Sequence, residues 1–170
     1  MSWTSFHMAI CGVLLLAASL SDVAWRRIPN LIVLPLAATG GVAQLYLGGP
    51  SRFLSGLAAG AIVFALLLIP WRKGLLGGGD LKLAVAAALW LAPERLPVFL
   101  LAGALAGGVI AIAVYASSAT AERREVRRNL AAAALTGNLG MLPAGREARR
   151  TVPYAVALAT GAMVAMLWRG

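Results

Sequence analysis

The sequence has almost none of the side chains that build disulfide bonds and soft metal sites. Cys11 is the single cysteine and His7 the single histidine among 170 residues. One cysteine cannot form a disulfide within its own chain, and a cysteine-based zinc site is excluded for the same reason. Independently of this count, we expect neither a metal ion nor another cofactor in the chemistry of this chain.

Acidic side chains are also scarce, since the chain has six Asp and Glu residues and 15 Lys and Arg residues. Four of the six are glutamates beside an arginine, where a solvated surface charge is the simplest interpretation. They are Glu94, Glu122, Glu125 and Glu147. Asp22 and Asp80 differ because each borders an apolar segment, so they remain as the candidates for acid–base chemistry.

Charged residues of either sign make up only 12% of the chain, whereas hydrophobic residues make up 61%. A soluble domain cannot hide so much apolar surface, so most of the surface is expected to face lipid. The apolar blocks are of roughly membrane-spanning length, unlike the short alternating runs of a β-barrel. We predict an all-α, polytopic membrane protein of about six transmembrane helices in a single domain, residues 1–170. The predicted segments are about Trp3–Leu20, Leu31–Leu47, Phe53–Pro70, Leu81–Leu91, Leu96–Ser117 and Val152–Trp168.

The fourth segment is too short to cross a bilayer by itself. Either it gains length by including Asp80 and its neighbours, or it lies shielded inside the bundle. Small residues recur in other segments, as in Gly56–Gly60 and Gly103–Gly107, and are expected to let neighbouring helices pack closely.

The distribution of basic residues predicts the orientation in the membrane. With the N-terminus outside, twelve of the 15 Lys and Arg residues fall in cytoplasmic connections, and both termini lie outside. Residues 118–150 then form a basic cytoplasmic loop that attracts anionic lipids. The net charge of +9 follows from this bias and calls for no nucleic-acid partner. The twelve residues are Arg26, Arg27, Arg72, Lys73, Lys82, Arg123, Arg124, Arg127, Arg128, Arg146, Arg149 and Arg150.

The first segment has an alternative interpretation as a cleaved signal peptide. It lacks a positively charged stretch before the apolar run, and Arg26 and Arg27 directly after the run act as a cytoplasmic anchor, which opposes export. We therefore expect the segment to remain in the mature protein, with His7 at the membrane interface near its outer end.

Asp22 ends the first segment and Asp80 opens the fourth, so this topology places both at the cytoplasmic face. Two carboxylates from different helices at one depth can share a proton and activate water. Position alone leaves a structural alternative, in which Asp80 is a helix N-cap and Asp22 is a solvated residue beyond a helix end.

Two motifs surround these aspartates. Residues 21–30 read SDVAWRRIPN and residues 77–83 read GGGDLKL. The first resembles a signature of the prepilin peptidases, an aspartate followed by basic residues and Ile-Pro-Asn. The second resembles their Gly-x-Gly-Asp motif with a following lysine, and residues 152–155, VPYA, resemble a third motif more weakly. The first two motifs match the family in their order, in the side of the membrane where they lie and in their spacing. The resemblance covers nearly the whole chain.

The resemblance implies that Asp22 and Asp80 are the catalytic pair of an aspartic endopeptidase. Members of the family remove the leader of type IV prepilins and pseudopilins at the cytoplasmic face of the bacterial inner membrane. The small size resembles the branch that serves Flp-type pili of the tight-adherence system. The cysteine-containing N-terminal domain of the large bifunctional members has no counterpart here, so methyltransferase activity is not expected.

The glycines of the second motif are expected to let an extended substrate approach the backbone and to let the Asp80 helix move. They are Gly77, Gly78 and Gly79, and Gly78 replaces a residue that is often Met in the family. Lys82 lies two positions after Asp80 and is therefore expected on a different helix face, either at the lipid headgroups or at the substrate.

Four further residues are candidates for supporting roles. Pro29 and Asn30 are expected to end one helix and start the next, so that a sharp turn holds Asp22. Arg26 and Arg27 satisfy the positive-inside rule, with contact to an acidic residue of the substrate as the alternative.

Pro153 and Tyr154 are expected to start the last helix and to anchor it at the interface, with lining of the site as the alternative.

Helix direction predicts which of the two aspartates holds the shared proton. Asp80, at a helix N-terminus, is expected to be mainly the carboxylate, and Asp22, at a helix C-terminus, mainly the acid.

A non-enzymatic membrane protein is the competing class, either a transporter whose aspartates carry protons or a scaffold for pilus assembly. A transporter favours acidic residues near the bilayer midplane and internal repeats. The two aspartates are predicted at the membrane edge instead, and no repeat is visible. We therefore favour the protease.

Overall fold

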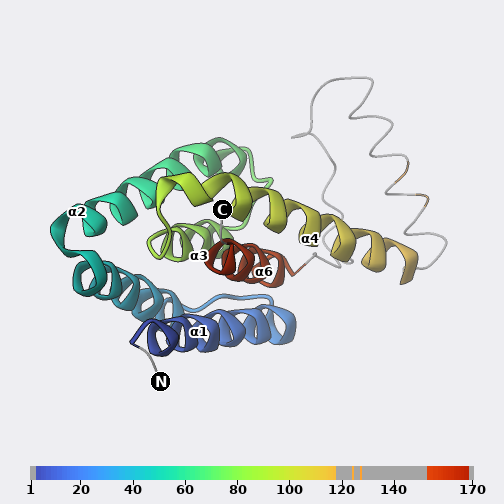
Figure 1. Ribbon diagram of the computed structural model, residues 1–170. Coiled ribbons are helices and arrows are strands. Elements are labelled where there is room, and N and C mark those ends of the chain that lie inside the picture. The colour runs from blue at the N-terminus through green and yellow to red at the C-terminus, as the bar shows by residue number, and fades with distance from the viewer. Residues whose placement is uncertain (1–2, 118–123, 125–126, 128–152, 169–170) are drawn as a thin grey trace.

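The computed structural model describes residues 3–117, 124, 127 and 153–168 (Figure 1). These residues form helices and no strands, which confirms the predicted all-α class. The basic loop at residues 118–150 falls almost entirely outside the described residues. The elements in chain order are α1 (Trp3–Trp25), α2 (Asn30–Arg72), α3 (Gly78–Ala88), the short 3₁₀ helix η1 (Pro93–Arg95), α4 (Leu96–Ser117) and α6 (Tyr154–Leu167).

Within the part of the chain that the structure describes, three stretches are long and apolar enough to cross a membrane: Phe6–Trp25, Asn30–Arg72 and Pro93–Ser117. The long helix α2 includes both the second and the third predicted segments. Helices α3 and α6 are shorter, with 11 and 14 residues. Each of the six predicted segments overlaps a helix among the described residues, while six complete crossings remain a prediction.

Helix α2 is interrupted at Gly48 and Gly49, and its two halves lead away from the break in different directions (Figure 1). Gly49 has φ of 69° and ψ of −165°, a conformation that side chains with a Cβ rarely adopt. Pro50 follows and cannot donate the backbone hydrogen bond that would continue the helix. The sequence Gly-Gly-Pro therefore accounts for the break.

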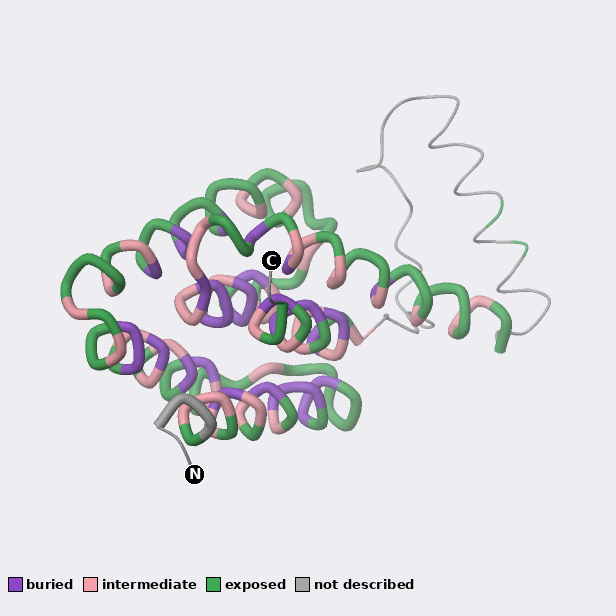
Figure 2. Tube along the Cα trace, in the orientation of Figure 1, coloured by how far each residue is buried: buried purple, intermediate pink, exposed green. Residues whose placement is uncertain are grey.

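Helix α3 is shielded inside the bundle, which confirms the second of the two alternatives for this segment. Its 11 residues rise only about 16 Å, about half of a hydrocarbon core of about 30 Å. Figure 2 shows α3 largely buried, whereas α4 is mostly exposed or intermediate. The buried residues of α3 are Leu81, Leu83, Ala84, Ala86, Ala87 and Ala88.

Close contacts at glycine fix the C-terminal end of α3 against α2. Trp90 donates a hydrogen bond from Nε1 to the carbonyl of Leu36 at 2.9 Å. A Cβ at Gly40 would lie 2.7 Å from the same Nε1, and a Cβ at Gly56 would lie 2.6 Å from the carbonyl oxygen of Leu89. The tryptophan and the turn after α3 can dock only because these two residues have no side chain.

The small-residue segments pack against neighbouring helices, as predicted. A Cβ added at Gly60 would lie 3.1 Å from Leu89 Cδ2, and a Cβ added at Gly103 or Gly107 of α4 would lie 3.5 Å from Ala157 of α6. In turn, a Cβ at Gly161 of α6 would lie 2.5 Å from the carbonyl oxygen of Phe99. Helices α4 and α6 therefore meet backbone to backbone, the contact that small residues permit within membranes.

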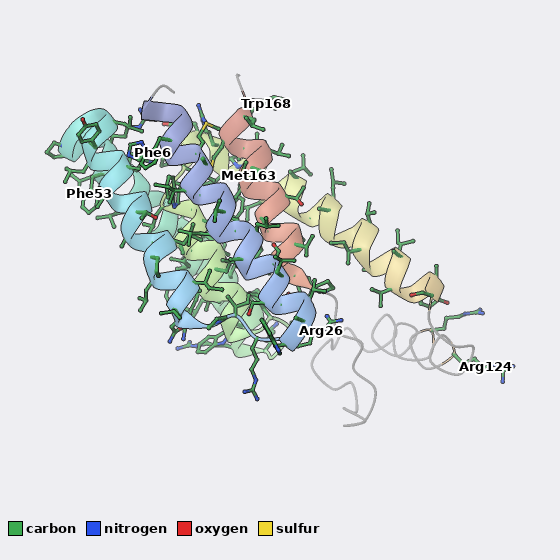
Figure 3. All side chains as sticks on the ribbon, turned by 90° about the horizontal axis from the view of Figure 1, so that it is seen from below. Phe6, Arg26, Phe53, Arg124, Met163 and Trp168 are labelled. Atoms are coloured by element: carbon green, nitrogen blue, oxygen red, sulfur yellow. The ribbon has the colours of Figure 1, made fainter. Side chains whose placement is uncertain are left out.

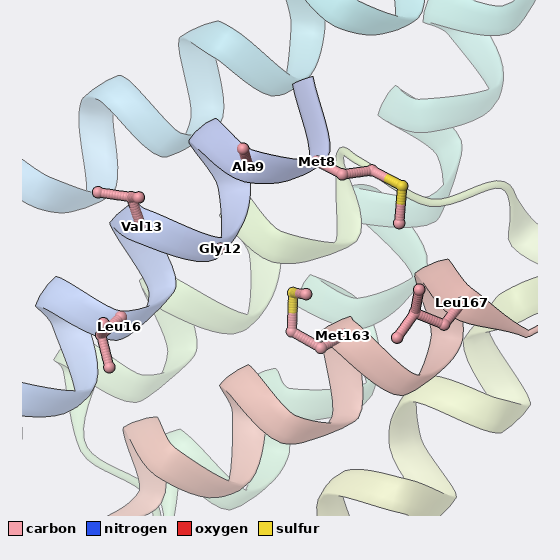
Figure 4. A pocket seen from close by; sticks show the side chains of 7 residues that line it. All are labelled: Met8, Ala9, Gly12, Val13, Leu16, Met163 and Leu167. Atoms are coloured by element: carbon pink, nitrogen blue, oxygen red, sulfur yellow. The ribbon is translucent and has the colours of Figure 1, made fainter. Parts of the chain in front are cut away.

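The bundle has two distinct ends. Figure 3 shows Phe6, Phe53 and Trp168 near one end and Arg26 near the other. We call these the opposite end and the aspartate end, because Asp22 lies one helical turn before Arg26. An apolar groove of about 550 Å³ lies between α1 and α6 (Figure 4). Its lining, which includes Gly12 and Met163, suits hydrocarbon rather than water.

Candidate active site

Asp22 lies in the last turns of α1 and is only 8% exposed. Its Oδ2 accepts a hydrogen bond from the backbone N–H of Ala155 at 3.1 Å. Ala155 is the second residue of α6, so its N–H is one of the groups at a helix N-terminus that have no partner within the helix. Asp22 satisfies that N–H and experiences the positive end of the α6 dipole.

Serine side chains fix the position of Asp22 on both sides. Ser19 Oγ donates to the carbonyl of Leu15 at 2.8 Å and contacts the carbonyl of Ala155 at 3.4 Å. Ser21 Oγ donates to the carbonyl of Arg27 at 2.7 Å, across the turn that ends α1. Both serines are buried, so the end of α1 is tied to α6 and to the following turn.

The turn after α1 is short and well defined. The N–H of Arg26 donates to the carbonyl of Asp22 at 2.9 Å, and Arg26 has φ of 54°, in the left-handed region where a helix commonly ends. Pro29 is the N-cap of α2 and Asn30 its first residue. The predicted role of these two residues in starting the next helix is confirmed.

Asp80 is the third residue of α3, and Gly77 is the N-cap. The Asp80 carboxylate accepts a hydrogen bond from the backbone of Gly77, as an acidic residue does in a capping box. A Cβ at Gly77 would lie 2.7 Å from Asp80 Oδ2. Asp80 thus caps its helix from within the first turn and not as the N-cap, and Gly77 leaves the space that its carboxylate occupies.

The other two glycines of the motif serve packing. Gly79 faces Ile28, whose Cβ would lie 3.3 Å from an added Cβ, and a Cβ added at Gly78 would lie 3.4 Å from Trp71 Nε1. Positive φ angles occur at Gly49 and Gly74 among the described glycines, and not in this motif. The motif glycines therefore allow close approach, while their predicted role in movement stays a prediction.

The two sequence motifs come together in three places. Ile28 of the first motif packs on Gly79 of the second. Lys82 Nζ donates to Asn30 Oδ1 at 3.4 Å, so the exposed lysine contacts the start of α2. The negative charge of Asp22 acts on Asp80. Segments from α1, α2 and α3 therefore form one site at the aspartate end.

Asp80 lies outside the three helices of spanning length, and its pKa is raised from 3.8 to about 6. Burial is the largest cause, because a charged carboxylate loses hydration. The charge of Asp22 raises the pKa further, whereas the hydrogen bond from Gly77 lowers it. Asp80 therefore keeps its proton in conditions where an ordinary carboxyl group is ionised.

The remaining predicted residues lie at the edge of this site. Arg26 and Arg27 have exposed side chains and contribute through their backbones. Pro153 is the N-cap of α6, and Tyr154 is 43% exposed. The sequence analysis missed Ser19, Ser21 and the N–H of Ala155. Only Ser21 gave a signal, since it directly precedes Asp22. Among the residues that the structure describes, no cluster of three or more His, Cys, Asp or Glu side chains could hold a metal ion.

The helices of spanning length and the two motifs that meet at one end of the bundle are typical of a helical membrane protein with acidic side chains at its candidate site. The chain belongs to the type IV leader peptidase family, whose model matches residues 9–112. This range includes Asp22 and Asp80 and ends within α4. No curated protein and no solved structure matches the chain. The family confirms the resemblance to prepilin peptidases and identifies the protein as a protease of the leader-peptidase type.

Proposed function

We propose that this protein removes the leader peptides of Flp-type prepilins and pseudopilins, with Asp22 and Asp80 as its catalytic pair. The observation that carries the proposal is the meeting of the two motifs at one end of the bundle, within the range that the family model matches. Two carboxyl groups under mutual influence, one of them with a raised pKa, are the arrangement by which aspartic proteases hydrolyse peptides.

The contacts favour Asp22 as the general base and Asp80 as the general acid. Asp22 Oδ2 accepts an N–H bond at the start of α6, an interaction that is stronger when the acceptor is a carboxylate than when it is a neutral acid. Asp80 has the raised pKa and is the better holder of the single proton. This assignment reverses the one expected from helix direction, which considered α1 and α3 but neither the burial of Asp80 nor the N-terminus of α6.

Hydrolysis then proceeds with each proton accounted for. Asp22 takes a proton from water as the water oxygen bonds to the scissile carbonyl carbon, and Asp80 donates its proton to the carbonyl oxygen. As the C–N bond breaks, the proton on Asp22 passes to the leaving amine, and the carbonyl re-forms by returning a proton to Asp80. The residues supply all the proton transfers of one turnover.

We further propose that the aspartate end faces the cytoplasm in the bacterial inner membrane. The basic residues near the helix ends on this side agree with the positive-inside rule, and they are Arg26, Arg27, Arg72, Lys73 and Lys82. If each half of α2 crosses the membrane, the break at Gly48 and Gly49 lies on the outer side.

Co-expression with a candidate Flp-type prepilin tests the function. Mass measurement of the pilin N-terminus is expected to show loss of the leader in the presence of the wild-type chain. An intact leader with the wild-type chain would contradict the proposal for that pilin. An intact leader with every prepilin and pseudopilin offered would contradict the proposed substrate class.

A further inference from the structure

We propose that the opposite end of the bundle holds a binding site for the phosphate group of an anionic ligand, between Arg52 and Arg95. A cavity of about 220 Å³ lies there. No Asp or Glu is among the described residues that line it. The polar lining residues are His7, Gln44, Arg52 and Arg95, and Trp90 is one of the apolar ones.

The break in α2 positions the first arginine. Arg52 folds back across the break, so that its Nε donates to Gln44 Oε1 at 2.9 Å. Gln44 is only 4% exposed, and its Nε2 donates to the carbonyl of Leu89 at 3.3 Å. A Cβ at Gly48 would lie 2.5 Å from Arg52 Cδ, so glycine leaves the path for this side chain. A buried amide therefore fixes the guanidinium, which can present its two Nη groups to a ligand.

The end of α6 positions the second arginine. Arg95 Nη1 donates to the carbonyls of Ala165 at 3.4 Å and Met166 at 3.1 Å, in the last turn of α6. These bonds satisfy helix carbonyls that lack partners within the helix. They also hold the guanidinium beside the cavity. Both arginines are thus oriented by protein contacts, although their side chains are largely exposed.

The charge at this end is unusual for the chain. Only three basic residues, Arg52, Arg95 and Arg169, fall outside the predicted cytoplasmic connections. Arg169 lies outside the described residues, and the other two line the same cavity. Two like charges fixed around one space repel each other, and an anion between them removes that repulsion. Arginine pairs bind phosphate oxygens with particular geometric fit.

The size of the cavity and the residues around it indicate which kind of anionic ligand it can hold. Small-molecule pockets usually measure about 300–1,000 Å³, so a cavity of about 220 Å³ suits a phosphate group and its ester linkage better than a whole metabolite. A phospholipid headgroup and a free phosphate ion share this chemistry. Trp90 and Met166 beside the cations resemble the aromatic and apolar surroundings of a headgroup site.

Native mass spectrometry of the full-length protein tests the site with phosphatidylglycerol as the probe. Arg52→Gln combined with Arg95→Gln is expected to weaken retention of one lipid by about tenfold, the loss expected when charge-assisted hydrogen bonds are removed. Arg72→Gln is the matched control, because it removes an exposed charge from the aspartate end. Equal retention by the double variant and the wild type, or an equal loss in the control, would overturn the proposal.

Inorganic phosphate distinguishes a site for a phospholipid headgroup from a site for the free phosphate ion. A thermal shift of the wild type with phosphate, absent in the double variant, identifies a site for the free ion. Lipid retention without that shift identifies a headgroup site, and either result supports the proposal. If the double variant does not insert, Arg52→Lys and Arg95→Lys keep the charges but lose the planar fork, and each is expected to bind lipid about threefold more weakly. Wild-type binding by both lysine variants would overturn the proposal. None of these readouts depends on peptidase activity.

Discussion

The two ends of the bundle use the same local feature to place one side chain of each candidate site, an acid at one end and an arginine at the other. At the aspartate end, Gly77 lacks the Cβ that would collide with Asp80, three residues later. At the opposite end, Gly48 lacks the Cβ that would collide with Arg52, four residues later. In both places a glycine at the edge of a helix lets the side chain in the next turn fold back over the backbone.

The ends differ in how far the charges are removed from solvent. Asp22 is buried and Asp80 is partly buried, whereas Arg52 and Arg95 are exposed. Burial raises the pKa of Asp80 and thereby prepares it for proton transfer. Exposed guanidinium groups keep their charge and suit binding. The comparison fits the two proposed sites, with reaction at one end of the protein and recognition of an anion at the other.

Replacement of the acids gives the largest expected difference between the ends. Asp22→Ala and Asp80→Ala are each expected to lower leader removal by a factor of about 10⁴ or more, because the pair acts as a unit. Quantified cleavage of a co-expressed prepilin measures the loss, and membrane fractionation verifies insertion. Glu94→Gln removes an exposed acid from the opposite end and should leave cleavage unchanged. Near-normal cleavage by either alanine variant rules out the pair.

Labelling of engineered cysteines tests whether the two ends face different compartments. In a Cys11→Ala background, a reagent that cannot cross the membrane should label Ser51→Cys in intact cells. It should label Lys73→Cys only after lysis, because the charge bias places the aspartate end inside. Both positions are exposed, so access depends on the compartment and not on burial. The reverse pattern would invert the predicted topology.

The roles within the aspartate pair can be separated by asparagine, which has the shape of a protonated aspartate. Asp80→Asn is expected to retain about tenfold more affinity for a transition-state-like inhibitor than Asp22→Asn, although both lose turnover. Calorimetric titration of the two variants measures the difference. The opposite order would restore the assignment that helix direction predicted.

The stability of the folded protein should depend on pH through the carboxyl group of Asp80. The pKa of Asp80 is higher in the folded protein, at about 6, than its ordinary value of 3.8. The protonated form therefore stabilises the fold fully below pH 3.8, and this contribution is lost as the pH rises through 6. The thermal midpoint of the wild type should fall across this range relative to that of Asp80→Asn, which cannot titrate. Parallel curves for the two proteins would show that Asp80 has no raised pKa.

Substitution of the two glycines beside Asp80 and Arg52 is expected to distinguish the two ends by a moderate effect on cleavage. Gly77→Ala is expected to lower cleavage by about tenfold, because Asp80 Oδ2 must move from a position 2.7 Å from the new methyl group. Gly48→Ala should spare cleavage, because its collision is with Arg52. Gly108→Ala is the neutral control, since nothing lies within 4 Å of its added Cβ. Equal cleavage by the Gly77 and Gly108 variants would contradict the collision.

The smallest expected effect concerns the contact between the motifs. Lys82→Ala removes an exposed hydrogen bond of 3.4 Å to Asn30, so leader removal is expected to fall by only about twofold to fivefold. Lys73→Ala, an exposed lysine with no part in this contact, serves as the control in the same assay. A loss as large as that of the aspartate variants would instead make Lys82 a direct contact of the substrate.

Much of this arrangement could be predicted from the order of residues. Apolar length located the helices, and the break after Leu47 coincides with Gly48, Gly49 and Pro50, whose chemistry is local. The short fourth segment gave two alternatives, since length alone does not reveal what covers a helix. The scarcity of acidic residues made Asp22 and Asp80 candidates, since such residues are rare in apolar surroundings, and the resemblance of the motifs around them led to the prediction of a catalytic pair.

Contacts between distant segments were beyond the reach of sequence reasoning. The N–H of Ala155 leaves no mark in the sequence, since every residue except proline has one. The position of Arg52 beside Arg95 depends on the direction that the chain takes after Gly49. The proposed reversal of the acid and base roles has the same origin, because it rests on the contact of Asp22 with another helix and on the burial of Asp80.

The hydrogen bond between Asp22 and Ala155 also sets the time at which the protease becomes complete during its synthesis. Asp22 leaves the ribosome early, Asp80 follows, and the N–H that orients Asp22 is made last. At about 5–20 residues per second, the ribosome needs roughly 4–15 s to travel from Asp80 to Ala155. The nascent chain therefore carries both acids in the membrane while the helix that orients one of them is still missing.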